Sequence, residues 1–377
     1  MKILFLFPHF SLPGGAADVT KKFARALQGK GHVVEILCAD ASTDFLTENS
    51  DLKISRLRIP KSDSFFYWLL FPYWQIRINR ALTKYADYIL FPQVLPSNWW
   101  AWIFKLTHRK QKIIWYCNEP SAFIHSKKWI DAIQNPLMRI GAKIANPFLK
   151  YIDIRLEKQN NFVICNSQFT ATEYERCYNR KAGDIIYPPF EIVSEEILQK
   201  KDKFFLSVGR ISKFKNIDLL INAFEKISKN HPAYTLIIAG DGEEKENLEK
   251  LVAKKDIADK ITFLGKISDE KKNELYKKAR ATMLCSENEP FGIVPVESMM
   301  HGTPVIAHNS GGPKETIKNN ETGFLFKDRN DLVDCMKNMI EMDEDNYLEM
   351  QKSAQARTKE FDISKSTAKL EEIFNKI

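Results

Sequence analysis

Short apolar runs that each end in glycine or in polar residues recur through the C-terminal half of this 377-residue chain. Four of them are Phe204 to Val208, Tyr234 to Ala239, Ile261 to Leu264 and Ala281 to Leu284. Stretches long enough for helices separate most of these runs, and strands that alternate with helices form parallel sheets. Ligands of such sheets bind at the edge formed by the carboxyl ends of the strands. The pattern therefore predicts an α/β domain with one ligand-binding edge.

The N-terminal half starts with the same kind of unit. Lys2 to Phe7 predicts a strand, Ala16 to Gln28 a helix, and Val33 to Cys38 a second parallel strand. The turn between the first strand and the helix contains Gly14 and Gly15, where a phosphate or sugar could approach the backbone closely. Tight turns need glycine even without a ligand, so this turn alone is weak support for a binding site.

The length of the chain suffices for two domains, each with its own core. Two prolines stiffen the segment after Tyr187, and we expect a hinge near residues 187–203. The predicted domains are residues 1–190 and 191–360. Residues 361–377 are predicted to form a last helix.

The segment from Ser286 to Gly302 holds the densest group of candidate ligand residues. Glu289 follows the run that ends at Leu284, and Glu297 lies one to two turns inside the next helix. A phosphate could bind the free N–H groups at the start of that helix, near Gly292, Ile293 and Val294. Carboxylates repel phosphate, so Glu297 suits the hydroxyls of a ribose and Glu289 those of a sugar. Taken alone, the spacing of the two glutamates favours a helix cap and a solvated side chain.

Two basic residues follow the run that ends at Val208. Arg210 comes directly after Gly209, and Lys215 precedes the next helix. Each could be a solvated loop residue, but together they look like a diphosphate clamp, in which arginine offers bidentate geometry and lysine a point charge. Gly265 and Lys266 follow another strand and belong to the same predicted edge.

Several motifs together resemble the donor site of the retaining glycosyltransferases of family four. They are Glu289-Pro-Phe-Gly-Ile-Val-Pro-Val-Glu297, Gly302-Thr-Pro-Val-Ile306, Gly311-Gly-Pro-Lys-Glu315, Val208-Gly-Arg210 with Lys215, and Ile238-Ala-Gly-Asp-Gly242. The resemblance covers nearly the whole chain and is most specific over residues 204–326. It implies the α/β GT-B architecture, in which two Rossmann-like domains with parallel sheets face each other across a cleft.

The resemblance also implies roles for individual residues. The donor phosphates would bind Arg210, Lys215 and the N–H groups of residues 292–294, while Glu297 would hold the ribose and Glu289 the transferred sugar. Phe291 belongs to the same donor loop. Gly14 and Gly15 would lie over the phosphates, and the last helix would cross back to the first domain, as in relatives.

No single catalytic base can be carried over from the family. Many relatives have a histidine near the reacting sugar where this chain has Asn118. Glu119 and His125 are nearby candidates for a base. The catalytic candidates are therefore Glu289, Arg210, Lys215 and Asn118.

Positive charge is concentrated in the N-terminal half. Residues 1–190 carry 26 Lys and Arg against 15 Asp and Glu, a net charge of +11, whereas the remainder carries −3. Aromatic clusters beside basic residues lie at 64–84 and 98–112, as in a surface that enters an anionic bilayer. The same aromatics could instead form core, or bind single-stranded nucleic acid. We expect an anionic membrane surface as a partner and no nucleic acid.

Other features of the sequence narrow the class of protein. The six cysteines contain no Cys-x-x-Cys pair, which favours reduced thiols over disulfides or zinc. No apolar run reaches the roughly 20 residues needed to span a bilayer, and the first apolar run is too short for a signal sequence. The N-terminal half lacks an Asp-x-Asp motif, so we expect no metal and no other cofactor. We predict a cytoplasmic protein, peripheral on the inner face of the membrane.

These observations predict a metal-independent, retaining hexosyltransferase. It would move a sugar, with mannose favoured, from GDP-mannose or a UDP-sugar to a glycan or lipid-linked acceptor. The departing phosphate would itself accept the proton of the acceptor, so that Asn118 is tolerated. Two rivals stay open: another GT-B enzyme such as a sugar-nucleotide 2-epimerase, and a catalytically idle scaffold that binds nucleotide sugar or membrane.

Overall fold

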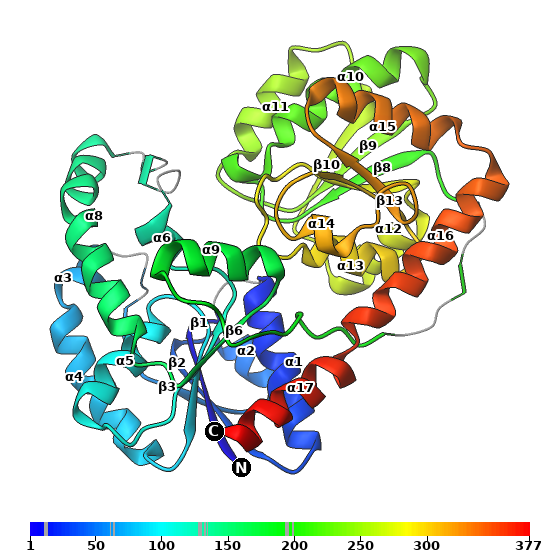
Figure 1. Ribbon diagram of the computed structural model, residues 1–377. Helices are drawn as coiled ribbons and strands as arrows, with labels where there is room; N and C mark the ends of the chain where they lie inside the picture. The colour runs from blue at the N-terminus through cyan, green and yellow to red at the C-terminus, as the bar shows by residue number, and fades with distance from the viewer. Residues whose placement is uncertain are drawn as a thin grey trace. The chain divides into compact units, whose positions relative to one another are not determined.

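The computed structural model describes residues 1–10, 14–60, 62, 65–126, 130–131, 133, 135–192, 196–197 and 200–377. The chain divides into two compact units. Unit 1 comprises Met1–Phe190 and Ile363–Ile377, and unit 2 comprises Glu191–Asp362. Each unit is built on parallel strands with helices packed against them, which confirms the predicted α/β class (Figure 1).

Unit 2 has one sheet of six parallel strands in the order β10-β9-β8-β11-β12-β13. The four apolar runs of the sequence all form strands of this sheet. Its strands are β8 (Phe204–Val208), β9 (Thr235–Ala239), β10 (Ile261–Gly265), β11 (Ala281–Leu284), β12 (Val305–His308) and β13 (Gly323–Phe326). The chain runs outward from the β8–β11 pair in opposite directions. The loops that follow these two strands therefore diverge and leave a crevice at their carboxyl ends.

Helices cover both faces of this sheet. They are α10 (Ile217–Asn230), α11 (Lys245–Ala253), α12 (Asp269–Lys278), α13 (Ile293–Met300), α14 (Pro313–Thr316), α15 (Arg329–Glu341) and α16 (Glu344–Thr358), with the short turns η2 (Lys213–Lys215), η3 (Ala258–Lys260) and η4 (Lys359–Phe361). Helix α12 ends at Lys278, so Arg280 lies outside it. Arg280 is buried, with its guanidinium carbon 3.5 Å from the ring centroid of Tyr347.

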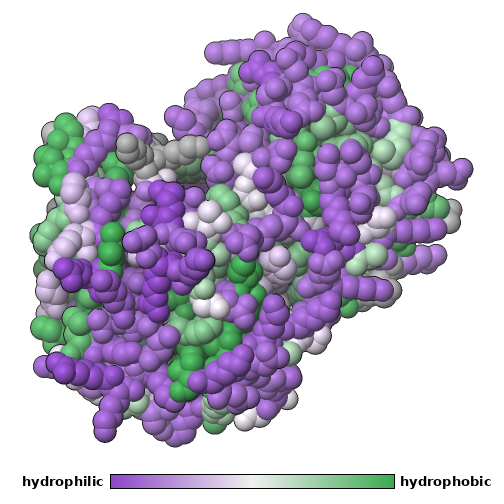
Figure 2. All heavy atoms as spheres, in the orientation of Figure 1, coloured by the Kyte–Doolittle hydropathy of each residue, from purple (hydrophilic) through white to green (hydrophobic). Residues whose placement is uncertain are grey.

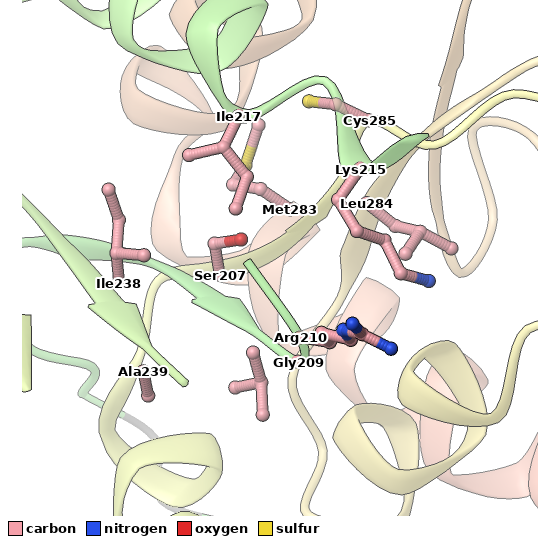
Figure 3. A pocket seen from close by; sticks show the side chains of 11 residues that line it. Ser207, Gly209, Arg210, Lys215, Ile217, Ile238, Ala239, Met283, Leu284 and Cys285 are labelled. Carbon is pink, nitrogen blue, oxygen red and sulfur yellow. The ribbon is translucent and has the colours of Figure 1, made fainter. Parts of the chain in front are cut away.

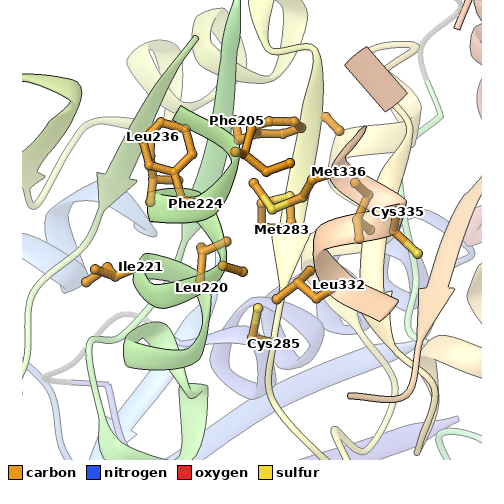
Figure 4. Close-up of a cluster of buried hydrophobic side chains, with 14 of the residues drawn as sticks. Phe205, Leu220, Ile221, Phe224, Leu236, Met283, Cys285, Leu332, Cys335 and Met336 are labelled. Atoms are coloured by element: carbon orange, nitrogen blue, oxygen red, sulfur yellow. The ribbon is translucent and has the colours of Figure 1, made fainter. Parts of the chain in front are cut away.

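The larger core of unit 2 lies between the sheet and helices α10 and α15. Figure 4 shows Phe205 and Met283 of the sheet near Phe224 of α10 and Met336 of α15. The other face packs β8 and β9 against α12, including Tyr276. Because both faces are covered, the strands read as nearly continuous apolar runs, as parallel strands do.

The strands of unit 1 are also parallel to one another. The strands β3-β2-β1-β4 and β5-β6-β7 are joined by a bridge between Leu90 and Ile113. They are β1 (Lys2–His9), β2 (Val33–Asp40), β3 (Lys53–Arg56), β4 (Ile89–Pro92), β5 (Ile114–Cys117), β6 (Phe162–Cys165) and β7 (Asp184–Ile185). The helices are α1 (Gly15–Gly29), α2 (Thr43–Glu48), α3 (Phe65–Leu69), α4 (Phe71–Leu82), α5 (Ser97–Thr107), α6 (Ala122–His125), α8 (Pro136–Glu157), α9 (Gln168–Tyr178) and α17 (Ile363–Lys376), with the short turn η1 (Thr83–Tyr85).

The second aromatic cluster of the sequence belongs to the core of unit 1. It forms α5, whose side chains Trp100, Trp102 and Phe104 are completely buried. The indole N–H of Trp100 donates to Tyr67, and that of Trp102 donates to Asn160, each at 2.8 Å. Buried indoles need such partners. The prediction that this cluster contacts a membrane is therefore wrong.

The last helix packs within unit 1. Figure 1 shows α17 beside α1, where Glu371 accepts hydrogen bonds from Lys30 at 2.6 Å and from His32 at 3.2 Å. Ser366 Oγ donates to the carbonyl oxygen of Tyr187 at 2.9 Å. The end of the chain is thereby tied to the end of the first segment of unit 1.

Lys201 ties three segments of unit 2 together. Its Nζ donates to the carbonyl oxygens of Lys277 and His301 and to Oγ1 of Thr303, at 2.6, 3.3 and 2.8 Å. Lys201→Met keeps the aliphatic stem but removes the donor from these acceptors. We expect the free energy of unfolding to fall by about 1–3 kcal/mol. The measurement is chemical denaturation, with Lys203→Met at an exposed position as the control, and equal midpoints for the two variants would contradict it.

Candidate functional site

A pocket lies at the carboxyl ends of β8 and β11, where the strand order of unit 2 changes direction. Its lining includes Gly209 and Arg210 after β8, Lys215 before α10, and Leu284 and Cys285 at the end of β11 (Figure 3). Figure 3 shows the side-chain nitrogens of Arg210 and Lys215 on the same side of this pocket. The fold therefore brings the two predicted clamp residues together at one sheet edge.

Lys215 and Ser286 both hold Glu289. The Nζ of Lys215 lies 2.8 Å from Oε2 of Glu289, and Oγ of Ser286 donates to the same oxygen at 2.8 Å. Both contacts use Oε2, and no described residue hydrogen-bonds to Oε1, which can accept a hydrogen bond from a ligand hydroxyl. An ammonium has three donors, so Lys215 can bind an anion while it holds the carboxylate.

The glycine pair of the Gly311-Gly-Pro-Lys-Glu315 motif supports the backbone of the Glu289 loop. The N–H of Gly312 donates to the carbonyl oxygen of Glu289 at 2.8 Å. Gly311 has φ +69°, and a Cβ there would lie 2.5 Å from that same oxygen. A Cβ on Gly312 would lie 2.3 Å from Cα of Phe291. The two backbones are so close that only glycine fits, and the motif thereby sets the position of Glu289.

Helix α13 begins without a side-chain cap. Its N-cap residue is Gly292, with φ +94°, and its first turn contains no acidic residue. The N–H groups of Ile293 and Val294 and the helix dipole thus offer positive potential to an anion. The ring of Phe291 is buried and lies 5.5 Å from that of Phe361. Its side chain supports the core and contributes no surface to the open edge.

Glu297 is held by a separate network from α12. The hydroxyl of Tyr276 donates to Oε2 at 3.0 Å, and Nζ of Lys272 lies 3.2 Å from Oε1. Burial, and then the nearby Glu297 carboxylate, raise the pKa of Tyr276 well above its ordinary value, so the phenol keeps its proton and stays a donor. Part of the Glu297 side chain is exposed, so the carboxylate can still accept from a ligand.

Other predicted donor residues lie away from this pocket. Gly265 is the last residue of β10, the edge strand, and Lys266 follows it; β9 separates this strand from β8. Neither is among the pocket-lining residues in the described part of unit 2. Gly14 and Gly15 lie at the start of α1 in unit 1. Their contact with a donor stays a prediction.

The candidate residues of unit 1 have different environments. Asn118 follows β5 at the carboxyl edge of the sheet, and its Nδ2 donates to Oε1 of Gln93 at 3.4 Å. Glu119 is exposed beside it. The ring of His125 is buried, with Nε2 2.8 Å from Oδ2 of the fully buried Asp153. His125 is therefore part of a buried polar cluster, which does not suit an open catalytic base.

Two family profiles match almost the whole chain. The profile described as Glycosyltransferase Family 4 matches residues 13–191, and the one described as Glycosyl transferases group 1 matches residues 190–360. The chain belongs to glycosyltransferase family 4. This confirms the family that the donor motifs predicted.

Curated relatives of this glycosyltransferase include alpha-1,3/1,6-mannosyltransferases. The human protein ALG2 is 29% identical over 249 residues, which cover 59% of this chain and 58% of that protein. The chain thus spans somewhat more than half the length of this relative. ALG2 of Kluyveromyces lactis is 25% identical over 380 residues, covering 85% of this chain and 72% of that protein.

Solved structures establish the GT-B fold of this glycosyltransferase. Anabaena HepE, in a crystal structure with UDP and glucose, has a TM-score of 0.78 at 19% identity, and both chains are fully covered. Sucrose-phosphate synthase from Thermosynechococcus elongatus has a TM-score of 0.80 at 18% identity, covering 100% of this chain and 98% of that chain. At such identities the likeness shows the fold alone.

The residues that position Glu297 could not be found from the sequence. Tyr276 and Lys272 precede Glu297 by 21 and 25 positions and reach it through the packing of α12 against α13. No local spacing marks such a pair. Ser286 was recoverable, because it lies three positions before Glu289 in the same polar loop.

The glycine pair provides a direct test of how the Glu289 loop is held. Gly312→Ala places a methyl group against the backbone of Phe291, so we expect the loop to shift and nucleotide-sugar turnover to fall at least about tenfold. Overpacking of this kind costs about 1–3 kcal/mol, which a thermal melt will detect. Gly29→Ala is the control, because the methyl group that it adds would meet no other segment of the chain within 4 Å. Unchanged turnover in Gly312→Ala would show that the loop position is not critical.

Proposed function

We propose that this chain is a retaining mannosyltransferase that acts on a glycan or lipid-linked acceptor at the inner face of a membrane. The observation that carries the proposal is the placement of Glu289 and Glu297 before and after the uncapped start of α13. Each carboxylate is held in its own network, and Arg210 and Lys215 supply positive charge at the same sheet edge. Mannose is favoured because the curated relatives named above are mannosyltransferases.

The parts of a nucleotide sugar correspond to different groups of this edge. Its diphosphate would bind Arg210, Lys215 and the N–H groups at the start of α13, which together combine charge-assisted hydrogen bonds with the helix dipole. Glu297 would accept hydrogen bonds from the ribose hydroxyls. Glu289 would accept them from the sugar, through the oxygen that Lys215 and Ser286 do not use.

The transfer step follows from where charge develops. The bond between the anomeric carbon and the diphosphate oxygen breaks, and the acceptor oxygen forms a bond to the same carbon on the same face, which retains configuration. The leaving diphosphate gains negative charge, which preorganised cations and N–H groups stabilise. The proton of the acceptor hydroxyl passes to the departing phosphate oxygen. This route needs no protein base, which agrees with the amide of Asn118 and the buried ring of His125.

The donor could carry GDP or UDP, and a different observation supports each nucleotide. The stretch Gly311-Gly-Pro-Lys-Glu-Thr316 resembles that of mannosyltransferases that use GDP-mannose, whereas the structurally similar HepE was crystallised with UDP and with UDP-glucose. GDP-mannose is therefore the first donor to test. The charge neutralisation is assigned to the cations of the chain, without a metal.

Binding and turnover of a panel of nucleotide sugars test this function. We expect GDP-mannose to raise the melting temperature, because a ligand of the native state stabilises it. Lys215→Ala should lower the rate of sugar release or transfer at least about tenfold, since a charge-assisted hydrogen bond contributes about 1.5–3 kcal/mol. Lys213→Ala, an exposed lysine in the same short turn, is the matched control.

The outcomes of this panel separate the rival functions. Conversion of the donor into an isomeric nucleotide sugar would indicate an epimerase. Donor binding without turnover under any condition would indicate a scaffold. Equal turnover in the two lysine variants would contradict the clamp.

A second experiment separates the two glutamates. Glu297→Gln should weaken binding of the free nucleoside diphosphate, because it replaces a carboxylate acceptor of the ribose with a weaker, neutral one. Glu289→Gln should leave that affinity nearly unchanged while transfer falls at least about tenfold, in line with loss of a charge-assisted bond. Calorimetric titration of the diphosphate and a transfer assay measure the two effects. Equal losses of diphosphate affinity would show that the roles are assigned incorrectly.

A further inference from the structure

Helix α8 exposes a continuous apolar stripe. Ile140, Ile144, Phe148 and Tyr151 are 56%, 76%, 67% and 58% exposed. Their spacing of four, four and three residues places them on one face of the helix. Large apolar side chains gathered in this way mark a surface that contacts another molecule or a membrane.

The opposite face of α8 is already fixed to unit 1. Asp153 is fully buried and accepts hydrogen bonds from Trp99 at 2.6 Å, His125 at 2.8 Å and Tyr178 at 2.7 Å. Leu156 on the same face belongs to the core cluster. The exposed stripe is therefore not a core face that has failed to pack, because the core face of this helix is occupied.

Exposed charge on α8 is positive. Its basic residues Arg139, Lys143, Lys150 and Arg155 are all at least partly exposed, whereas its two acids, Asp153 and Glu157, are buried. The guanidinium carbon of Arg155 lies 5.2 Å from the ring centroid of Tyr151 in the stripe. Lys143 pairs with Asp131 at 2.7 Å, but both side chains are more than half exposed, and such pairs are weak.

A second exposed surface of the same character lies on α3 and α4. Leu69, Leu70, Tyr73 and Ile76 are between 45% and 60% exposed. Residues 64–86 contain three basic residues and no Asp or Glu. Helix α5 contacts both α4 and α8, and Figure 1 shows α3, α4 and α8 along one side of unit 1. Figure 2 shows hydrophobic residues gathered on that side, beside hydrophilic ones.

We infer that the α8 stripe, together with the exposed residues of α3 and α4, is the surface by which this chain docks on an anionic lipid bilayer. Apolar side chains flanked by charges of one sign suit an interface that is apolar inside and anionic at its surface. A protein partner would need an acidic group opposite each basic residue, whereas an anionic bilayer presents negative headgroups over its whole surface. The inference rests on the proposed function for the membrane as the place of action and for the lipid-linked acceptor, and it does not depend on the donor.

The position of α8 connects this surface to the expected acceptor edge. Asn146 of α8 donates through Nδ2 to the carbonyl oxygen of Ile124 on α6, at 2.6 Å. Helix α6 follows the loop that carries Asn118 at the carboxyl end of β5. A bilayer bound at α8 therefore lies close to the edge of unit 1 at which a lipid-linked acceptor is expected.

Flotation with lipid vesicles tests the inference. We expect the protein to float with vesicles of phosphatidylcholine mixed with phosphatidylglycerol and to stay in solution with phosphatidylcholine alone. Floating should weaken as salt rises from 0.1 to 1 M, because the Debye length contracts from about 10 Å to about 3 Å. The double variant Ile144→Glu/Phe148→Glu should lose at least about tenfold in vesicle affinity, since it places two charges in the apolar interface. Leu264→Glu, at an exposed leucine of unit 2, is the matched control and should float as before.

Two results would overturn the inference, and a third would identify a different occupant of the surface. Failure of the unmodified protein to float with anionic vesicles at low salt overturns the inference, as does equal flotation of the double variant. A change of the double variant from dimer to monomer by light scattering, without vesicle binding in either form, would show a contact between copies of the chain. The melting-temperature rise with GDP-mannose is measured on the same variants. A rise that persists in a protein that does not float leaves the proposed donor site intact while the docking surface is rejected.

Discussion

The divergence of the chain at β8 and β11 is the constraint on which the candidate site depends. The chain leaves β8 toward β9 and leaves β11 toward β12, on opposite sides of the pair. The loops at the carboxyl ends of β8 and β11 therefore turn away from each other and leave an opening between them. The loop after β8 contributes Arg210 and Lys215, and the loop after β11 contributes Glu289. The ion pair of Lys215 with Glu289 then links the two loops directly. A sheet built in simple sequential order would give these loops no common opening.

In unit 1, a buried carboxylate fixes the orientation of helix α8. Asp153 turns toward the core of unit 1 and collects hydrogen bonds from α5, α6 and α9 through Trp99, His125 and Tyr178. A carboxylate buried at this depth is stable only when its lone pairs are satisfied, so the three partners fix the rotation of α8. That rotation decides which residues of α8 face outward. The apolar stripe is thus a consequence of a polar cluster on the other side of the same helix.

Much of the fold was predictable because parallel strands covered on both faces are nearly continuous apolar runs. All four runs of unit 2 form strands, and Ser268 and Ser167 cap α12 and α9 as small polar residues do at helix starts. The aromatic segments were not predictable in the same way. A segment rich in Trp and Tyr looks the same in the sequence whether it lies at a surface or in a core. The hydrogen-bond partners of Trp100 and Trp102, which lie far away in sequence, show that α5 is buried. The exposed apolar residues of α8 were missed because their segment reads as an ordinary amphipathic helix.

The sequence by itself determined the family, the alternation of strands and helices, and the residues that follow each strand, because these depend on local pattern and on motifs. The tertiary structure decided which of those residues meet. Glu297 is held by Tyr276 and Lys272 through the packing of α12 on α13, and the Glu289 loop is supported by Gly312 from beyond the next strand. It also decided that α5 is core and that α8 presents apolar side chains outward. The physical reason is that burial and hydrogen-bond partnership depend on neighbours distant in the chain, which no local pattern contains.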